Sequence, residues 1–289
     1  MKHKEFAVFI MVHGRPDKMW TYQTLRRGGY TGKIYLVGDN LDSTIDGYKK
    51  KYKDELLVFD KNEAASKMDA GDNTGDLRST LFSANTIPEL AKGKGIEYFF
   101  IMCDDYNCFS YKFNEHLKFI SDKSITNLDF IFDSMVDFME KNKNVSSLAM
   151  AQTGDFIGGK HGGYAKKPTL KRKAMNSFLC STDRPFKFIG RLNEDVTTYV
   201  NLGGKGVIFF TIPLLSITQK ETQTTEGGLS DVYLEYGTYT KSFFSVMYNP
   251  SSVKVSMIGV THKRLHHRIN WKHAVPLIVN EKHRKRSLV

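Results

Sequence analysis

The sequence predicts an α/β protein with a mostly parallel central sheet and helices on both faces. Apolar runs alternate with helix-like segments over residues 1–110, and this alternation is typical of parallel sheets. Acidic residues directly follow several of these runs, where ligands bind in such sheets. An apolar content of 40% and a charged content of 25% allow a sizeable core. With 289 residues, the chain is long enough for one large domain or two small ones.

Four strands and three helical segments are expected in the first part of the chain. The helical segment at 21–30 ends in a glycine pair that suits a C-cap, and the lysine-rich segment 48–55 is compatible with a helix. A third helix is expected at 77–91, where Pro88 should interrupt or kink it. The predicted strands are residues 6–12, 33–39, 56–60 and 97–103.

The clearest helix lies at residues 124–142. Thr126 and Asp129 resemble a capping box at its start. We interpret it as a packing helix without chemistry, because its apolar residues recur at spacings of three, four and seven: Leu128, Ile131, Phe132, Met135, Val136 and Met139.

A change of composition follows this helix. Residues 153–173 are rich in glycine and lysine and are expected to form a surface loop. The segments predicted to be regular are a helix at 193–204 and strands at 145–152, 175–181, 186–190 and 206–213.

Positive charge is concentrated in two segments. The net charge is +11; residues 160–191 contribute +8 and residues 261–289 contribute +7, which leaves −4 for the rest of the chain. Each segment alone is as compatible with a merely solvated basic face or tail as with a binding surface. Together, on a mildly acidic body, they favour a polyanionic partner, with DNA or RNA first.

Several classes of protein are excluded. No apolar run approaches the roughly 18 residues that span a bilayer, so no membrane partner is expected. The run at 6–12 lacks a cleavage site and is interpreted as a strand rather than a signal peptide. Three cysteines without a CxxC pair indicate a reducing compartment, the cytoplasm. No phosphate-binding loop is present, and His266 and His267 have no nearby cysteine to complete a zinc site.

Asp104 and Asp105 follow the apolar run 97–103 directly. Two adjacent carboxylates at the end of a buried strand repel each other and are costly to bury, unless a cation compensates them. Mg²⁺ prefers one or two carboxylates together with phosphate oxygens. The alternative is an ordinary strand-to-loop junction. Asp39 and Asp60 also follow predicted strands.

Three strand-end motifs together resemble the GT-A nucleotide-sugar glycosyltransferases. They are "HGRP" after the first strand, "GDN" after the second and "CDDY" after the fourth. More narrowly, "GRLNEDVTTYVNLGGKGVIFFTIP" and "HHRINWKHAVPLIVNEKHRK" resemble the TET-associated glycosyltransferases of bacteriophages, over nearly the whole chain. The resemblance implies one GT-A-like domain over 1–289. It would contain a Rossmann-like nucleotide-sugar half at 1–110, an acceptor half at 111–260 and a basic segment at 261–289.

The resemblance also implies roles for individual residues. Asp104 and Asp105 would hold Mg²⁺ or Mn²⁺ with His262, although Cys103 replaces the first acid of a strict DxD motif. One carboxylate of Glu194 and Asp195 would act as general base, although acids at a helix start are favourable for dipole reasons alone. The nucleotide-sugar would contact His13, Gly14, Arg15, Asp39, Arg78 and Asp104.

The implied reaction moves a sugar, glucose or arabinose, from a UDP-sugar to 5-hydroxymethylcytosine in double-stranded phage DNA, in the host cytoplasm. The target base would be flipped out, with Trp271 or Tyr164 filling the gap unless Trp271 is a core residue. One alternative is a metal-dependent nuclease that uses Asp104, Asp105 and Glu194. Another is a non-catalytic DNA-binding protein with a degenerate fold. The expected phosphate contacts are Lys166, Lys167, Lys171, Arg172, Lys173, Arg264 and Arg268.

Overall fold

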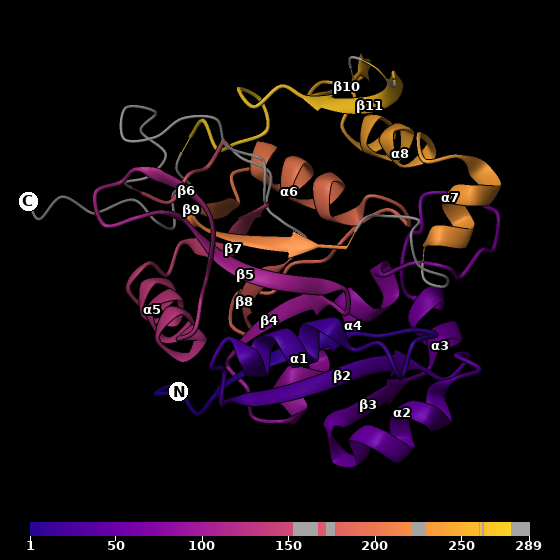
Figure 1. Cartoon of the computed structure of the whole chain (residues 1–289). Coiled ribbons are helices and arrows are strands. Elements are labelled where there is room, and N and C mark those ends of the chain that lie inside the picture. Colours follow the sequence, from indigo (N-terminus) through magenta and orange to yellow (C-terminus); the bar gives the residue numbers. More distant parts are fainter. Residues whose placement is uncertain (153–166, 172–176, 221–228, 260, 262, 279–289) are drawn as a thin grey trace, which may run out of the picture.

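A nine-stranded sheet forms the centre of the molecule, and a two-stranded hairpin lies beside it (Figure 1). The computed structural model describes residues 1–152, 167–171, 177–220, 229–259, 261 and 263–278. The strands of the large sheet are β1 (Phe6–Met11), β2 (Lys33–Asp39), β3 (Leu56–Phe59), β4 (Tyr98–Cys103), β5 (Tyr106–Phe113), β6 (Phe119–Ser124), β7 (Val145–Gln152), β8 (Phe178–Ser181) and β9 (Ile208–Gln219).

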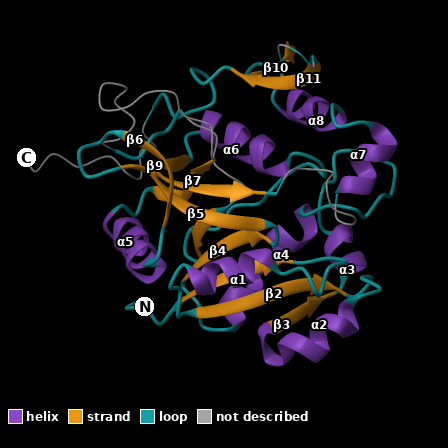
Figure 2. Ribbon diagram, in the orientation of Figure 1, coloured by secondary structure: helices purple, strands orange, loops and turns teal. Residues whose placement is uncertain are grey.

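Helices connect and cover these strands (Figure 2). The hairpin consists of β10 (Val253–Ile258) and β11 (Arg264–Ile269). The helices are α1 (Trp20–Arg27), α2 (Ile45–Tyr52), the 3₁₀ turn η1 (Lys53–Glu55), α3 (Lys61–Ser66), α4 (Leu81–Gly93), α5 (Leu128–Lys141), α6 (Glu194–Gly204), α7 (Ser230–Tyr236) and α8 (Thr240–Tyr248). In the described part of the chain, none of these helices is long and apolar enough to cross a membrane.

Most strands of the large sheet point the same way. The strand order is β3-β2-β1-β4-β8-β7-β9-β5-β6. The first four strands are parallel, β8 runs against both β4 and β7, and β9 is parallel to β7. β5 runs against β9 and β6 against β5, so only β8 and β5 oppose the other seven. The prediction of a mostly parallel sheet is confirmed.

Both faces of the sheet are buried, which explains why the early strands are apolar throughout. Alternate residues of β1 join different core clusters: Phe6, Val8 and Ile10 on one face, Ala7 and Phe9 on the other. The first cluster also contains buried residues of α1, α2 and α5, and the second contains those of α3, α4 and α6. Helices therefore cover both faces, as predicted.

The packing helix is confirmed as α5, and all six of its predicted apolar residues are buried. Its predicted capping box is wrong. Asn127 is the N-cap and its side chain makes no capping bond. Asp129 instead accepts from the amino group of Met1 at 2.6 Å and from the backbone of Thr31 at 2.8 Å. A carboxylate bonded to a full positive charge gains more than one bonded to a neutral amide.

The glycine pair after α1 ends that helix as predicted. Gly29 has a φ of +80°, and a Cβ atom there would lie 2.4 Å from the backbone oxygen of Thr126. The helix predicted from residue 77 begins only at Leu81 and contains Pro88. Residues 77–80 belong to the preceding loop.

Two predicted strands differ from the structure. Residues 186–190 are irregular, and their apolar rings pack: Phe186 and Phe188 lie 5.3 Å apart between ring centroids. β9 does not end at Pro213 but continues to Gln219. Pro213 is tolerated because it lies where the register with β7 shifts, and a missing amide donor is harmless at such a bulge.

Candidate active site

The carboxyl ends of β1, β2 and β4 place polar residues at one edge of the sheet. Arg15, in the turn after β1, donates from Nη2 to Oδ1 of Asp104 at 2.7 Å. His13 Nδ1 lies 3.3 Å from Oδ2 of Asp39 at the end of β2. Gly14, with a φ of +74°, directs its amide to Asp42 at 2.9 Å. The structure therefore brings together most of the residues expected to contact the nucleotide.

Asp39 is a buried carboxylate with two cationic or potentially cationic neighbours. Lys61 Nζ lies 3.0 Å from its Oδ2, and His13 approaches the same oxygen. Burial acts to raise the pKa of Asp39, but the hydrogen bonds of His13 and Lys61 hold it below its ordinary value. Sequence reasoning missed Lys61. Its only sequence signal is its place immediately after Asp60, at the end of a predicted strand.

The paired aspartates follow β4. Asp104 is 3% exposed, and its Oδ2 is buried without a hydrogen-bond partner among the described residues. Burial raises the pKa of Asp104 to about 7; Arg15 opposes this rise and Asp105 adds to it. Asp105 accepts from Gln219 Nε2 at 3.0 and 3.2 Å, and burial raises its pKa as well.

These two aspartates fit a divalent cation. The unpartnered Oδ2 of Asp104 is a buried acceptor, and a hard cation would offset the mutual repulsion of the pair. The described residues contain one cluster of three potential metal ligands, His3, Glu5 and Glu140, beside the start of β1 at the opposite end of that strand. Within the described residues the two aspartates are not part of such a cluster, so further ligands of an ion there would come from outside these residues or from a bound molecule.

A second acidic pair, Glu194 and Asp195, starts helix α6. Asn193, the N-cap, has a left-handed φ of +59° and donates to Ser245 Oγ at 2.6 Å. Thr80 Oγ1 donates to Glu194. Burial, and then the charge of Asp195, raises the pKa of Glu194 to about 7. A carboxyl group with such a pKa suits proton transfer near neutral pH.

The two acidic pairs belong to one site. The thiol of Cys103 has a pKa well above its ordinary value, first because it is buried and then because Asp105, Asp104 and Glu194 all act on it. The hydroxyl of Tyr233 on α7 likewise has its pKa raised by burial and then by Glu194 and Asp195. Carboxylates separated by some 90 residues in the sequence thus act on the same thiol at the end of β4.

Arg191 holds together two segments that lead to the acidic residues of the site. It is 2% exposed, and its guanidinium contacts Asp72 at 2.8 Å and Asp76 at 3.1 Å. Its backbone amide donates to Ala70 O at 2.7 Å. Arg191 therefore joins the loop at 67–80 to the segment that leads into α6. Sequence reasoning counted Arg191 only as part of a basic segment.

Arg78 is not placed as expected. It lies in the loop before α4 rather than on a helix. Its guanidinium forms ion pairs with Asp76 and with Glu235 of α7, both at 2.7 Å. A residue already held by two carboxylates is less suited to a bidentate contact with a diphosphate.

The late histidines and Trp271 occupy distinct positions. His267 is 8% exposed, and its Nδ1 lies 3.3 Å from Asn193 Nδ2, which gives it a place in the core beneath α6. Trp271 is partly buried against the core and stacks on Tyr199 with ring centroids 5.9 Å apart. His262 and Tyr164 lie outside the described residues.

The expected phosphate contacts are partly described. Lys167 and Lys171 are exposed, as are Arg264 and Arg268 on β11. The other three expected contacts lie outside the described residues: Lys166, Arg172 and Lys173.

Comparison with solved structures finds similar chains at low identity. S. aureus TarS 1-349 in complex with UDP is 10% identical with a TM-score of 0.46, over 85% of this chain and 65% of that chain. Mannosyltransferase PcManGT from Pyrobaculum calidifontis in complex with GDP-Man and Mn²⁺ is 10% identical with a TM-score of 0.48, over 85% of this chain and 63% of that chain. The present chain thus spans slightly less than two thirds of these proteins' length.

A third structure is matched over most of both chains. Glucosyl-3-phosphoglycerate synthase from Mycobacterium tuberculosis, in complex with Mn²⁺, UDP and phosphoglyceric acid, is 9% identical with a TM-score of 0.43. The match covers 94% of this chain and 88% of that chain. A comparison with curated proteins found no match. The sequence model of one family, TET-Associated Glycosyltransferase, matches residues 6–228, which is more than half of the chain. The chain therefore belongs to the TET-associated glycosyltransferase family.

Proposed function

We propose that this protein transfers a sugar, glucose or arabinose, from a UDP-sugar to the hydroxymethyl group of 5-hydroxymethylcytosine in double-stranded DNA. The cofactor is Mg²⁺ or Mn²⁺. The observation that carries the proposal is that Asp104, Asp105 and Glu194 all lie close enough to Cys103 to raise the pKa of its thiol. One acidic pair suits a metal-bound diphosphate, and the other suits the activation of a hydroxyl group. Family membership supplies the reaction class.

The donor binds at the carboxyl edge of β1, β2 and β4. Asp104 and Asp105 would hold the divalent ion together with oxygens of the donor diphosphate, and His262 is the further ligand that the sequence suggests. When bound, this ion neutralises the charge that develops on the leaving nucleoside diphosphate. Arg15 lies beside the diphosphate, and His13 and Asp39 line the nucleoside pocket. Their mutual contacts support this assignment.

Proton transfer is the task of the second acidic pair. Asp195 accepts the proton of the acceptor hydroxyl group. At the same time the oxygen of that hydroxyl group bonds to the anomeric carbon of the sugar, and the bond from this carbon to UDP breaks. The Glu194 side chain is bonded to Thr80, whereas the Asp195 side chain makes no hydrogen bond within the described residues. One direct displacement of this kind inverts the configuration at the anomeric carbon.

The charge distribution supports DNA as the acceptor. The two basic segments together carry +15, whereas the chain as a whole carries +11. Exposed Arg264 and Arg268 lie on one of these segments. Flipping the target base out of the duplex costs a few kcal/mol, which contacts to the DNA backbone offset. Affinity for DNA should therefore fall steeply with salt concentration.

One domain performs both tasks in this proposal. Residues 1–110 bind the nucleotide-sugar, residues 111–260 form the acceptor half, and residues 261–289 add basic contacts to DNA. A sheet that continues without interruption from β3 to β6 supports the single domain.

The experiment is mass spectrometry of nucleosides from DNA that contains 5-hydroxymethylcytosine. The DNA is incubated with the protein, Mn²⁺ and, in separate reactions, UDP-glucose and UDP-arabinose. A gain of one hexose or one pentose on the modified nucleoside is expected, and nicked DNA would instead indicate the nuclease. No gain in nucleoside mass with any UDP-sugar, although the protein binds the DNA, would favour a non-catalytic DNA-binding protein.

Asp105→Asn provides the matched control. Asparagine is close to aspartate in shape, but its amide is a poor ligand for a hard cation. The variant should therefore abolish sugar transfer and any rise in melting temperature that Mn²⁺ gives the wild type. DNA binding, measured by fluorescence anisotropy, should remain. Unchanged transfer by Asp105→Asn would contradict the assigned metal site.

A further inference from the structure

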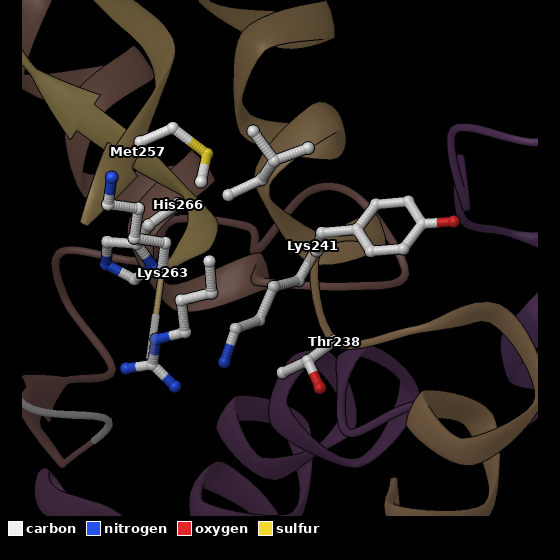
Figure 3. A pocket seen from close by; sticks show the side chains of 8 residues that line it. Thr238, Lys241, Met257, Lys263 and His266 are labelled. Atoms are coloured by element: carbon white, nitrogen blue, oxygen red, sulfur yellow. The ribbon is translucent and has the colours of Figure 1, made fainter. Parts of the chain in front are cut away.

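A pocket of about 380 Å³ opens between the start of α8 and the β10–β11 hairpin (Figure 3). Side chains from the helix and from the hairpin converge on it. This volume lies in the range of small-ligand sites. Eight residues line the pocket: Thr238, Tyr239, Lys241, Met257, Lys263, Arg264, Leu265 and His266.

The pocket is suited to an anion. Lys241, Lys263 and Arg264 carry positive charge, His266 carries it when protonated, and none of the described lining residues is acidic. In Figure 3, the amino group of Lys241 extends from the helix toward the side where His266 of the hairpin lies. A negative ligand that enters this cavity would be attracted by several cations at once.

The hairpin extends this positive charge into a row. Side chains alternate along β11, so Arg264, His266 and Arg268 share one face, while His267 is buried on the other. Lys254 of β10 is paired with Arg268 across the hairpin. The row therefore leads away from the pocket, as a linear polyanion requires and a single small anion does not.

Exposed apolar side chains adjoin these cations. Tyr239 is 50% exposed and Phe243, one turn later on α8, is 48% exposed. Their ring centroids are 6.2 Å apart. Met257 and Leu265 also line the pocket with apolar surface. Cations interleaved with exposed aromatic rings are typical of surfaces that bind unpaired nucleotides, because every base can stack on a ring.

Lys241 connects the pocket to the second acidic pair. Its Nζ lies 5.2 Å from the ring centroid of Tyr233, and its charge acts on Glu194. The pKa of Tyr233 is raised by burial and then by the charges of Glu194 and Asp195. The donor diphosphate, by contrast, is proposed to bind beside Arg15 and Asp104. The pocket therefore adjoins the carboxylates assigned to the acceptor.

We propose that this pocket binds a phosphodiester group of the acceptor DNA, next to the nucleotide that receives the sugar. Lys241 and Arg264 pair with the phosphate, and Tyr239 and Phe243 stack against a neighbouring base. This inference rests on the proposed function, which supplies DNA as the polyanion. It makes the hairpin and α8 the part of the protein that positions the acceptor strand.

The test compares two double variants of equal charge. Lys241→Ala/Arg264→Ala removes two cations from the pocket. Lys50→Ala/Lys92→Ala removes two exposed cations from α2 and α4, outside the pocket. Affinity for a fluorescent hydroxymethylcytosine duplex is measured by anisotropy at several salt concentrations, without any sugar donor. Circular dichroism confirms that both variants are folded.

We expect the pocket variant to bind DNA at least tenfold more weakly than the control variant. Its slope of log affinity against log salt concentration should decrease by about one, since the pocket holds one phosphate and each phosphate contact contributes about 0.9 for B-DNA. Equal affinities and slopes of the two variants, or no DNA binding by the wild type, would overturn the proposal. Because this assay contains no donor, its outcome is independent of whether sugar transfer is detected.

Kinetics separate the acceptor from the donor. In the transfer assay, the pocket variant should raise the KM for DNA, and Phe243→Ala should do so on the order of fivefold while Phe243→Tyr restores it. A rise in the KM for the UDP-sugar with unaltered affinity for DNA would assign the pocket to the donor diphosphate and overturn the proposal.

Discussion

Arg15 and Asp104, which follow two neighbouring parallel strands, form an ion pair with 2.7 Å between Nη2 and Oδ1. The pair joins the turn after β1 to the acidic end of β4. Asp104 is buried, and its second oxygen has no hydrogen-bond partner within the described residues. Arg15 thus compensates a carboxylate that would otherwise be buried alone.

Removal of this cation should destabilise the fold in a pH-dependent manner. The pKa of Asp104 is about 7, so the group is largely neutral at pH 5 and largely ionised at pH 8. Arg15→Ala should therefore lower the free energy of unfolding at pH 8 by on the order of 2 kcal/mol more than at pH 5. Urea unfolding without divalent ions measures both values. Arg15→Lys, which keeps the charge, is the control, and an equal loss at both pH values would contradict the assignment.

Glu194 should make the fold less stable as the pH rises. Its folded-state pKa is raised from 4.5 to about 7, so the stability it allows is fully present below pH 4.5 and is lost as the pH rises through 7. Glu194→Gln, which remains neutral and can still accept from Thr80, should be more stable than the wild type at pH 8 by about 1–2 kcal/mol. At pH 4 the two proteins should unfold alike, as followed by thermal denaturation. A loss of stability at both pH values would show that the hydrogen bond with Thr80 outweighs the burial of charge.

Arg191 should be required for the shape of the active site. Arg191→Ala leaves the carboxylates of Asp72 and Asp76 without their buried partner, at a cost of about 3–5 kcal/mol in the free energy of unfolding. The segment leading to Glu194 would also lose its anchor, so kcat should fall. Arg27→Ala on the surface of α1 is the control, with an expected effect below about 0.5 kcal/mol. Wild-type kcat in a folded Arg191→Ala protein would contradict this positioning role.

Gly203 should be irreplaceable where residues 270–276 pack against α6. A Cβ atom at this position would lie 2.3 Å from the backbone oxygen of Ala274. A backbone atom cannot move aside as the end of a flexible side chain can. Gly203→Ala should therefore lower the melting temperature by several degrees. Gly93→Ala, in the last turn of α4 with nothing within 4 Å of its added methyl group, is the matched control and should leave stability unchanged or slightly raised. Equal melting temperatures of the two variants would contradict this packing.

The corrected elements show where local sequence signals are insufficient. Residues 186–190 have the composition of a strand. Their aromatic rings instead pack on one another and on Phe178, so these rings are in contact with other rings although the segment pairs with no strand in the described part of the chain. Thr126 and Asp129 have the spacing of a capping box, but the chain terminus competes successfully for the carboxylate. In the second case, a contact remote in the sequence replaced the local one.

The sequence by itself determined the parallel half of the sheet and the acids at its edge. The strands β1, β2 and β4 are largely buried, so each is a mostly apolar run, and its end lies where polar residues begin. The amphipathic helix α5 was equally readable, because one of its faces packs on the sheet and the other does not. Asp104, Asp105, Glu194 and Asp195 stood out because each pair immediately follows or starts a regular element.

Only the tertiary structure decided which residues meet. The partners of the acids, Lys61, Gln219, Thr80 and Tyr233, have ordinary sequence surroundings and reach the site through strand order and helix packing. The same holds for the pocket, whose cations come from a helix and a hairpin that carry no strong periodic signal. Periodicity reports only whether a residue faces the core or the solvent. Distances between elements are set by how the two buried faces of the sheet are filled, which no single segment encodes.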